Sequence, residues 1–214
     1  MAIPVIGLGA GGHARVVIEI LQHNPKYEVV CLLDTNSELH GKEVSGIPIL
    51  GNDTLLPKLV EQGIRHCFIG LGSVGNATPR KKLYHLALSH NLEPVNSIHP
   101  TALISPSAQT GLGLTAAAYS VINAGVIIGE NVIINTGAIV EHDCTIGSHA
   151  HIATGARLAS NVQVGDGAHI GIGVSIRQCI VIGEGAIVGA GAVVVKDVPA
   201  ASTVVGTPAK PLRP

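Results

Sequence analysis

A single six-residue period runs through the second half of the chain. Counting in steps of six from Ile98 to Val194, nearly every position carries isoleucine, leucine or valine. The positions four residues further on, from Ala102 to Val198, are small or aliphatic almost throughout. A sandwich of unrelated short strands would not keep one register over this length, whereas stacked coils of short strands require it. The period therefore predicts a parallel β-helix in which three hexapeptides form one triangular coil.

Glycine often follows the large aliphatic residue of the repeat. The examples are Gly129, Gly147, Gly165, Gly171, Gly183 and Gly189. We expect these glycines to form the corners at which the chain turns between short strands. One aliphatic stack fills the inside of such a prism and leaves no internal cavity. Any chemistry must therefore take place on an outer face or between neighbouring prisms.

The first half of the chain follows a different pattern, up to about residue 96. Apolar runs such as EVVCLLD, IPILG and HCFIGLG alternate with helical stretches at residues 13–23, 55–62 and 79–91. This alternation indicates βαβ units around a small parallel sheet. We therefore expect a Rossmann-like α/β domain over residues 1–96 and a β-helix domain over residues 97–214 with a short C-terminal tail.

A glycine-rich turn opens the first helix of the α/β domain. Gly7, Gly9 and Gly12 fit the G-x-G-x-x-G spacing after an apolar strand, and Asp34 ends the next strand. Backbone amides at the start of a helix can hold a phosphate. The motif alone would suggest NAD, but this domain is too short for the two mononucleotide-binding halves that a dinucleotide occupies. One nucleotide diphosphate fits it better.

Composition and charge exclude several classes of partner. The net charge of −1 gives no electrostatic reason to expect nucleic acid or an anionic membrane. The chain has no basic leader followed by an apolar stretch, and no uncharged apolar run reaches the roughly 18 residues of a membrane span. We expect a cytoplasmic protein that binds a small molecule.

Four cysteines, Cys31, Cys67, Cys144 and Cys179, lie in or beside apolar runs and form no CxxC pair. We expect them to be buried, reduced thiols. Because the histidines, cysteines and acids lack ligand spacing, no metal site is predicted.

The corner Glu141-His142-Asp143 replaces the usual small residues of the repeat with three polar ones. By register His142 points out of the core, whereas Cys144 belongs to the inward class and is excluded as a nucleophile. A neutral imidazole can take the proton from an amine or hydroxyl that attacks a thioester. Glu141 or Asp143 could orient the ring, and a backbone N–H from an adjacent coil could bind the oxyanion.

The alternative interpretation is that His142 is an ordinary surface histidine. The flanking acids, and His151 half a coil further on, favour a functional role. Neither His149 nor His169 has a comparable setting in the sequence.

Four segments together carry a resemblance: GAGGH near the N-terminus, LLD at the end of the second strand, VEHD in the repeats and VVGTPAK near the C-terminus. Over essentially the whole chain they resemble the nucleotide-sugar N-acetyltransferases of the bacillosamine and perosamine pathways and the related sialic acid O-acetyltransferases. VVGTPAK is common among hexapeptide transferases, whereas GAGGH with VEHD is more specific. The resemblance implies a left-handed β-helix, acetyl-CoA as co-substrate and a homotrimer with active sites at the subunit interfaces.

The resemblance also implies roles for individual residues. His142 corresponds to the general base, with Asp143 as its acidic neighbour and Asn135 near the active site as a substrate contact. The implied acetyl-CoA contacts are His151, Ile172, Gly173 and Ala190. The implied nucleotide-sugar contacts are Gly11, Gly12, His13, Asp34, Thr35 and Gly72.

The leading hypothesis is therefore an acetyl-CoA-dependent N-acetyltransferase that serves surface glycan biosynthesis. It would act on the 4-amino group of a UDP-linked bacillosamine-type or GDP-linked perosamine-type dideoxy sugar, by direct attack and without an acyl-enzyme. O-acetylation of a sialic acid or another sugar is the second hypothesis, against which the diphosphate-type turn argues. A non-catalytic trimeric binding scaffold is the third.

Overall fold

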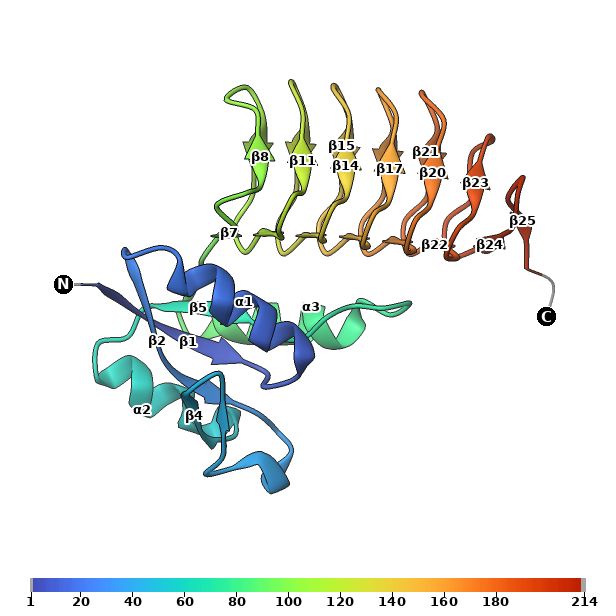
Figure 1. The fold of residues 1–214 in the computed structure, drawn as a ribbon. Helices are drawn as coiled ribbons and strands as arrows, with labels where there is room; N and C mark the ends of the chain where they lie inside the picture. Colours follow the sequence, from blue (N-terminus) through green and yellow to red (C-terminus); the bar gives the residue numbers. More distant parts are fainter. Residues whose placement is uncertain (1, 213–214) are drawn as a thin grey trace.

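The computed structural model describes residues 2–212, which form an α/β domain followed by a triangular prism of stacked coils (Figure 1). The predicted fold class is confirmed, and Figure 1 shows the prism lying along one side of the α/β domain. Among the described residues, none of the helices has the length and apolar character needed to cross a membrane.

The α/β domain has helices on both faces of one sheet. Its elements are β1 (Ile3–Leu8), α1 (Gly12–Gln22), β2 (Tyr27–Leu33), the 3-10 turn Ser37–Leu39, β3 (Glu43–Val44), β4 (Ile47–Gly51), the 3-10 turn Asp53–Leu55, α2 (Leu56–Glu61), β5 (His66–Ile69), α3 (Thr78–Ser89) and β6 (Glu93–Pro94). The strand order is β3-β4-β2-β1-β5-β6. All pairs are parallel except β3–β4, so the sheet is mixed at one edge.

The prism has three faces, and each is a stack of two-residue strands. At the C-terminal end, a three-residue strand and then an antiparallel strand extend one of these faces. The long face holds β7 (Ser97–Ile98), β10 (Thr115–Ala116), β13 (Ile133–Ile134), β16 (His151–Ile152), β19 (His169–Ile170), β22 (Ile187–Val188), β24 (Thr203–Val205) and β25 (Lys210–Pro211). The middle face holds β8 (Leu103–Ile104), β11 (Val121–Ile122), β14 (Ile139–Val140), β17 (Arg157–Leu158), β20 (Ser175–Ile176) and β23 (Val193–Val194). The short face holds β9 (Gln109–Thr110), β12 (Ile127–Ile128), β15 (Thr145–Ile146), β18 (Gln163–Val164) and β21 (Val181–Ile182).

The core of the prism is the aliphatic stack that the six-residue period predicts. Both inward positions of the repeat are buried in one cluster that runs from Leu114 to Val204. The first coil differs, because Ile98 is 41% exposed and Thr110 is also exposed. No preceding coil covers this end of the prism, so the register alone does not bury these side chains.

The prediction that the repeat glycines form the corners of the coils is wrong. The left-handed backbone that turns each corner recurs two residues later, at every sixth residue from Gly113 to Gly191. The glycines after the aliphatic residue serve instead where coils approach closely. At Gly147, for example, an added Cβ would lie 2.6 Å from the backbone nitrogen of Asp166. Close stacking of coils, and not chain reversal, selects glycine there.

Three of the four cysteines are buried as expected, but Cys179 is exposed. It occupies one of the corner positions, with a φ of 58°, and its side chain therefore points away from the aliphatic stack. The prediction of a buried thiol is wrong for this residue.

Candidate functional site

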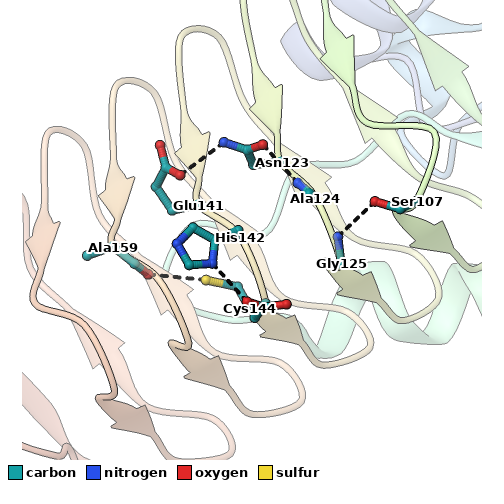
Figure 2. Close-up of polar contacts among 9 residues, drawn as sticks. Ser107, Asn123, Ala124, Gly125, Glu141, His142, Cys144 and Ala159 are labelled. Carbon is teal, nitrogen blue, oxygen red and sulfur yellow. Dashed lines mark hydrogen bonds and ion pairs between the residues drawn. The ribbon is translucent and has the colours of Figure 1, made fainter.

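The predicted catalytic residues lie together at one corner of the prism, between β14 and β15 (Figure 2). We call the row of corners between the middle and short faces, which includes residues 123–125, 141–143 and 159–161, the His142 edge. The side chains of His142 and Asp143 are 52% and 59% exposed. Cys144, by contrast, is buried, and its Sγ donates to the Ala159 carbonyl at 3.2 Å. Burial raises the pKa of the Cys144 thiol to about 11, so Cys144 is no nucleophile at neutral pH.

Asp143, and not Glu141, contacts the His142 ring. His142 Nδ1 donates to Asp143 Oδ2 at 2.8 Å, which leaves the lone pair of Nε2 available. The Glu141 carboxylate turns toward the preceding coil, where Asn123 Nδ2 donates to its Oε2 at 3.0 Å (Figure 2). Within one chain, Asp143 therefore orients the imidazole.

The local sequence explains this geometry. Asp143 occupies a left-handed corner with a φ of 60°, a conformation that aspartate tolerates better than most residues. Gly125 occupies the same corner of the preceding coil, and a Cβ added to it would lie 2.6 Å from Asp143 Oδ1. Glycine at position 125 thus leaves room for the carboxylate that holds His142.

A second group of predicted residues lies on a different edge, between the long and middle faces. We call this row of corners, which includes residues 135–137, 153–155, 171–173 and 189–191, the Asn135 edge. An apolar pocket of about 350 Å³ lies there, between the prism and the loop that joins β5 to α3. Its lining includes Asn135, His151, Ile172 and Ala190, whereas Gly173 is outside the lining.

His151 is buried, and both of its ring nitrogens have hydrogen-bond partners. Its Nδ1 faces the Ser73 carbonyl at 3.5 Å, and Asn135 Nδ2 donates to its Nε2 at 3.2 Å. Burial, with a contribution from the charge of neighbouring His169, lowers the pKa of His151 to about 4. His151 is therefore neutral at physiological pH and has no free lone pair for a substrate proton.

Sequence reasoning missed His169, which lies in the wall of the same pocket. It pairs with His151 in register across β16 and β19, and the two ring centroids are 4.9 Å apart. The two histidines are one full coil apart in sequence, and this spacing is the signal that could have found the pair.

The glycine-rich turn adopts the predicted strand–turn–helix geometry. Gly11 is the N-cap of α1 and Gly12 its first residue, and a Cβ added at either position would have no atom of residues 2–212 within 4 Å. The first N–H groups of a helix have no acceptor within the helix, so they are available to a phosphate here. Gly72 lies beside the turn, with 3.9 Å between a Cβ added to it and the His13 Cβ.

His13 lies near His151 of the prism, and its buried Nε2 has no hydrogen-bond partner in the part of the chain that the structure describes. Burial, followed by the nearby Arg80 and His151, lowers the pKa of His13 to about 3. Arg80 is 1% exposed, and its Nη1 donates to the carbonyls of Ile69 and Leu71 at 2.8 and 2.6 Å. Arg80 thus fixes the strand end that carries Gly72, and neither its contacts nor its burial could be inferred from the sequence.

Asp34 and Thr35 line a small pocket at the carboxyl end of the sheet. Ala10 N–H donates to one carboxylate oxygen of Asp34 and Asn36 N–H to the other, each at 2.8 Å. Asp34 therefore anchors the glycine-rich turn itself. Among residues 2–212, no group of three or more histidines, cysteines and acids is close enough to hold a metal ion.

Acidification is expected to destabilise the domain junction. His13 and His151 have lower pKa values in the folded chain, about 3 and about 4, than the 6.5 of a solvated histidine. Below pH 6.5 the unfolded chain therefore binds more protons, and the free energy of unfolding falls until the pH reaches the folded values. Each residue should contribute a loss on the order of 2 kcal/mol by pH 5.

Urea unfolding at pH 7.5 and pH 5.0 measures this loss. The double variant His13→Gln, His151→Gln should lose less stability between the two pH values than the wild type. The exposed His23→Gln serves as the control and should behave like the wild type. An equal loss in the wild type and the double variant would contradict the expectation.

Comparisons with known proteins agree over both domains. Residues 5–87 match the family described as the PglD N-terminal domain, and residues 125–160 match the bacterial transferase hexapeptide family. The structure of PerB from Caulobacter crescentus in complex with CoA and GDP-perosamine is 40% identical, with a TM-score of 0.91. The match covers 98% of this chain and 97% of PerB. In further structures of that protein, a histidine is replaced by asparagine or alanine.

Two other relatives are similar. The acetyltransferase domain of PglB from Neisseria gonorrhoeae, in complex with acetyl coenzyme A, is 36% identical with a TM-score of 0.90, over 99% of this chain and 100% of that domain. The GDP-perosamine N-acetyltransferase of Escherichia coli O157:H7 is 32% identical over 143 residues. That match spans 64% of this chain and 62% of the length of the curated relative.

Proposed function

Because the chain belongs to the PglD-type family of hexapeptide-repeat nucleotide-sugar N-acetyltransferases, we propose that it acetylates an amino group of a nucleotide-linked sugar with acetyl-CoA. The proposed acceptor is the 4-amino group of a dideoxy sugar of the bacillosamine or perosamine type, and the product serves surface glycan synthesis. Relatives whose structures hold CoA with GDP-perosamine, or acetyl coenzyme A, support both substrates.

The observation that carries the proposal is the His142–Asp143 pair. A histidine whose Nδ1 donates to a carboxylate has a fixed tautomer and a basic Nε2. It lies on an exposed edge, within reach of an acceptor that arrives from outside the prism. In the Caulobacter relative, a histidine was replaced by asparagine or alanine, which agrees with a histidine that acts as the base.

The reaction follows from this geometry. The sugar amine forms a C–N bond to the thioester carbonyl carbon while His142 Nε2 takes the proton that the nitrogen loses. A backbone N–H can stabilise the oxyanion. The N–H of Ser160, at the corresponding corner of the next coil, has no acceptor among residues 2–212 and is suited to this. When the carbonyl re-forms, the C–S bond breaks, and the proton on His142 neutralises the departing CoA thiolate.

A second copy of the chain completes the proposed site. The base lies on the His142 edge, whereas the apolar pocket suited to acetyl-CoA lies on the Asn135 edge, and His142 is not part of its lining. A closed three-fold assembly of prisms would bring the two edges of neighbouring copies together three times. The homotrimer is thus part of the proposal, since it unites base and pocket.

Acetyl transfer to a panel of acceptors tests the proposal. Release of free thiol from acetyl-CoA should be rapid with a nucleotide-linked 4-amino-4,6-dideoxy sugar and near background with the 4-hydroxy analogue. The product should survive mild alkali, because an amide is stable where an O-acetyl ester is hydrolysed. Alkali-labile acetylation, or turnover with CMP-linked sialic acid alone, would favour the O-acetyltransferase hypothesis. Thermal stabilisation by CoA without thiol release from any acceptor would favour the binding scaffold.

A further inference from the structure

A pocket at the carboxyl end of the sheet contains an aspartate whose side chain has no hydrogen-bond partner among residues 2–212. Two adjoining pockets, of about 130 and 440 Å³, lie at the carboxyl end of the sheet and share Thr35, Asp53, Leu71 and Leu83. Asp53 begins the 3-10 turn that lies one residue beyond the end of β4, and no donor among residues 2–212 hydrogen-bonds to its carboxylate. We propose that Asp53 recognises the base of the nucleotide sugar and that the base is guanine.

Strand order places the parts of the pocket along the sheet edge. The order β4-β2-β1 puts the glycine-rich turn, Asp34 and Asp53 at the ends of three successive strands. A diphosphate at the start of α1 leaves the ribose and base to extend across neighbouring strands. Two strand spacings, about 10 Å, separate β1 from β4. This is the scale on which a nucleotide spans from its diphosphate to its base, so Asp53 lies on the base side.

The two aspartates of the pocket differ in what they already bind. Both oxygens of Asp34 accept backbone N–H groups, at 2.8 Å each. Asp53 is half-buried and has no hydrogen-bond donor among residues 2–212, and its pKa is raised above the ordinary value by loss of solvent and by the charge of Asp34. Two N–H donors from a ligand would compensate for this loss of solvent.

The shape of the pocket fits an aromatic base held edge-on to Asp53. Leucine side chains line both adjoining pockets, and they provide apolar surface for the two faces of a ring. The lining includes Leu33, Leu71, Leu83 and Leu86. Lys82 lines the outer pocket and is exposed. The pocket therefore combines apolar walls with one carboxylate acceptor and one cationic donor.

Guanine is the base whose edge matches these two groups. It presents N1–H and N2–H side by side, which a carboxylate can accept together, and its O6 is an acceptor suited to the Lys82 ammonium. Uracil offers one N–H between two carbonyl oxygens, and a carboxylate facing that edge would repel at least one of them. Adenine and cytosine each place a ring acceptor beside the amino group. A paired contact of this kind discriminates bases by about five- to hundredfold.

Calorimetric titration of the full chain with GDP, IDP and UDP tests the assignment, which rests on the proposed function because that function supplies a nucleotide ligand. GDP should bind about tenfold or more tightly than UDP, and tighter than IDP, which lacks the N2 amine. Asp53→Asn should weaken GDP about tenfold or more, remove the GDP–IDP difference and leave UDP little changed. With the GDP-linked substrate, the same variant should raise KM and leave kcat close to wild type.

Glu28→Gln, at the opposite end of β2, is the matched control and should leave all three affinities unchanged. Melting temperatures without ligand show whether each variant is folded. Equal affinity of the wild type for GDP and UDP, or an equal loss for every nucleotide in Asp53→Asn, would overturn the guanine assignment and leave the proposed function intact. If none of the three nucleotides binds, the nucleotide part of the proposed function fails, and the assignment fails with it.

Discussion

Replacing His142 by asparagine is expected to lower kcat by about two to four orders of magnitude, the range for loss of a general base. Asparagine keeps a polar side chain of similar size at the corner but cannot take the proton of the attacking amine. The fold should not change, because His142 is half-exposed and its ring hydrogen-bonds to Asp143 alone among residues 2–212. Initial rates of thiol release at saturating substrates measure the effect.

Two further variants sharpen this measurement. Asp143→Asn keeps a hydrogen-bond acceptor for Nδ1 but removes the charge, so its loss of kcat should be smaller than that of His142→Asn. His23→Asn, on the exposed end of α1, should retain wild-type activity. If His142→Asn keeps more than about a tenth of the wild-type kcat, the ring is not the base.

Co-expression of two inactive variants is expected to restore activity. His142→Asn removes the base on one edge, whereas Ile172→Glu places a charge in the apolar pocket on the other edge, at a position that is 62% exposed and tolerant of substitution. In a mixed trimer, a site is intact when its base comes from an Ile172→Glu copy and its pocket comes from a His142→Asn copy. Random mixing makes about a quarter of the sites intact, so activity should reach about a quarter of wild type from near background.

Co-expression of His142→Asn with His142→Ala is the control, since no mixed site in that pair holds an intact base. It should remain as inactive as either variant alone. If the His142→Asn and Ile172→Glu pair is equally inactive although mixed trimers form, base and pocket do not meet across a subunit interface.

The sequence predicted the prism well because a single period fixes which side chains face inward. The same register correctly assigned Cys144 to the core and His142 to the outside. The register failed where a residue has no neighbouring coil, as at Ile98. The burial expected for Cys179 rested on its apolar neighbours and not on the register, and the corner conformation exposes this residue. A repeat pattern predicts the burial of side chains in an average coil, but it does not predict what happens at the ends of the prism.

The candidate site was less predictable, because its parts lie far apart in the sequence. Whether Glu141 or Asp143 orients His142 depends on which carboxylate Asn123 of the preceding coil engages. Asp53 belongs to no motif, and only the strand order brings it beside Asp34. Side chains assembled by tertiary structure leave no spacing that a single sequence can reveal.

The spacing of the coils limits which insertions the prism can accept without losing its pocket. Ile172 and Ala190 lie one coil apart in the prism, His142 lies on an earlier level, and each coil moves the chain along the axis by one strand spacing of about 4.8 Å. An insertion of one or two hexapeptides that continue the repeat would move every later corner onto a different edge, so it would separate the pocket residues from one another. The height of the pocket wall along the prism axis can therefore change only in whole coils.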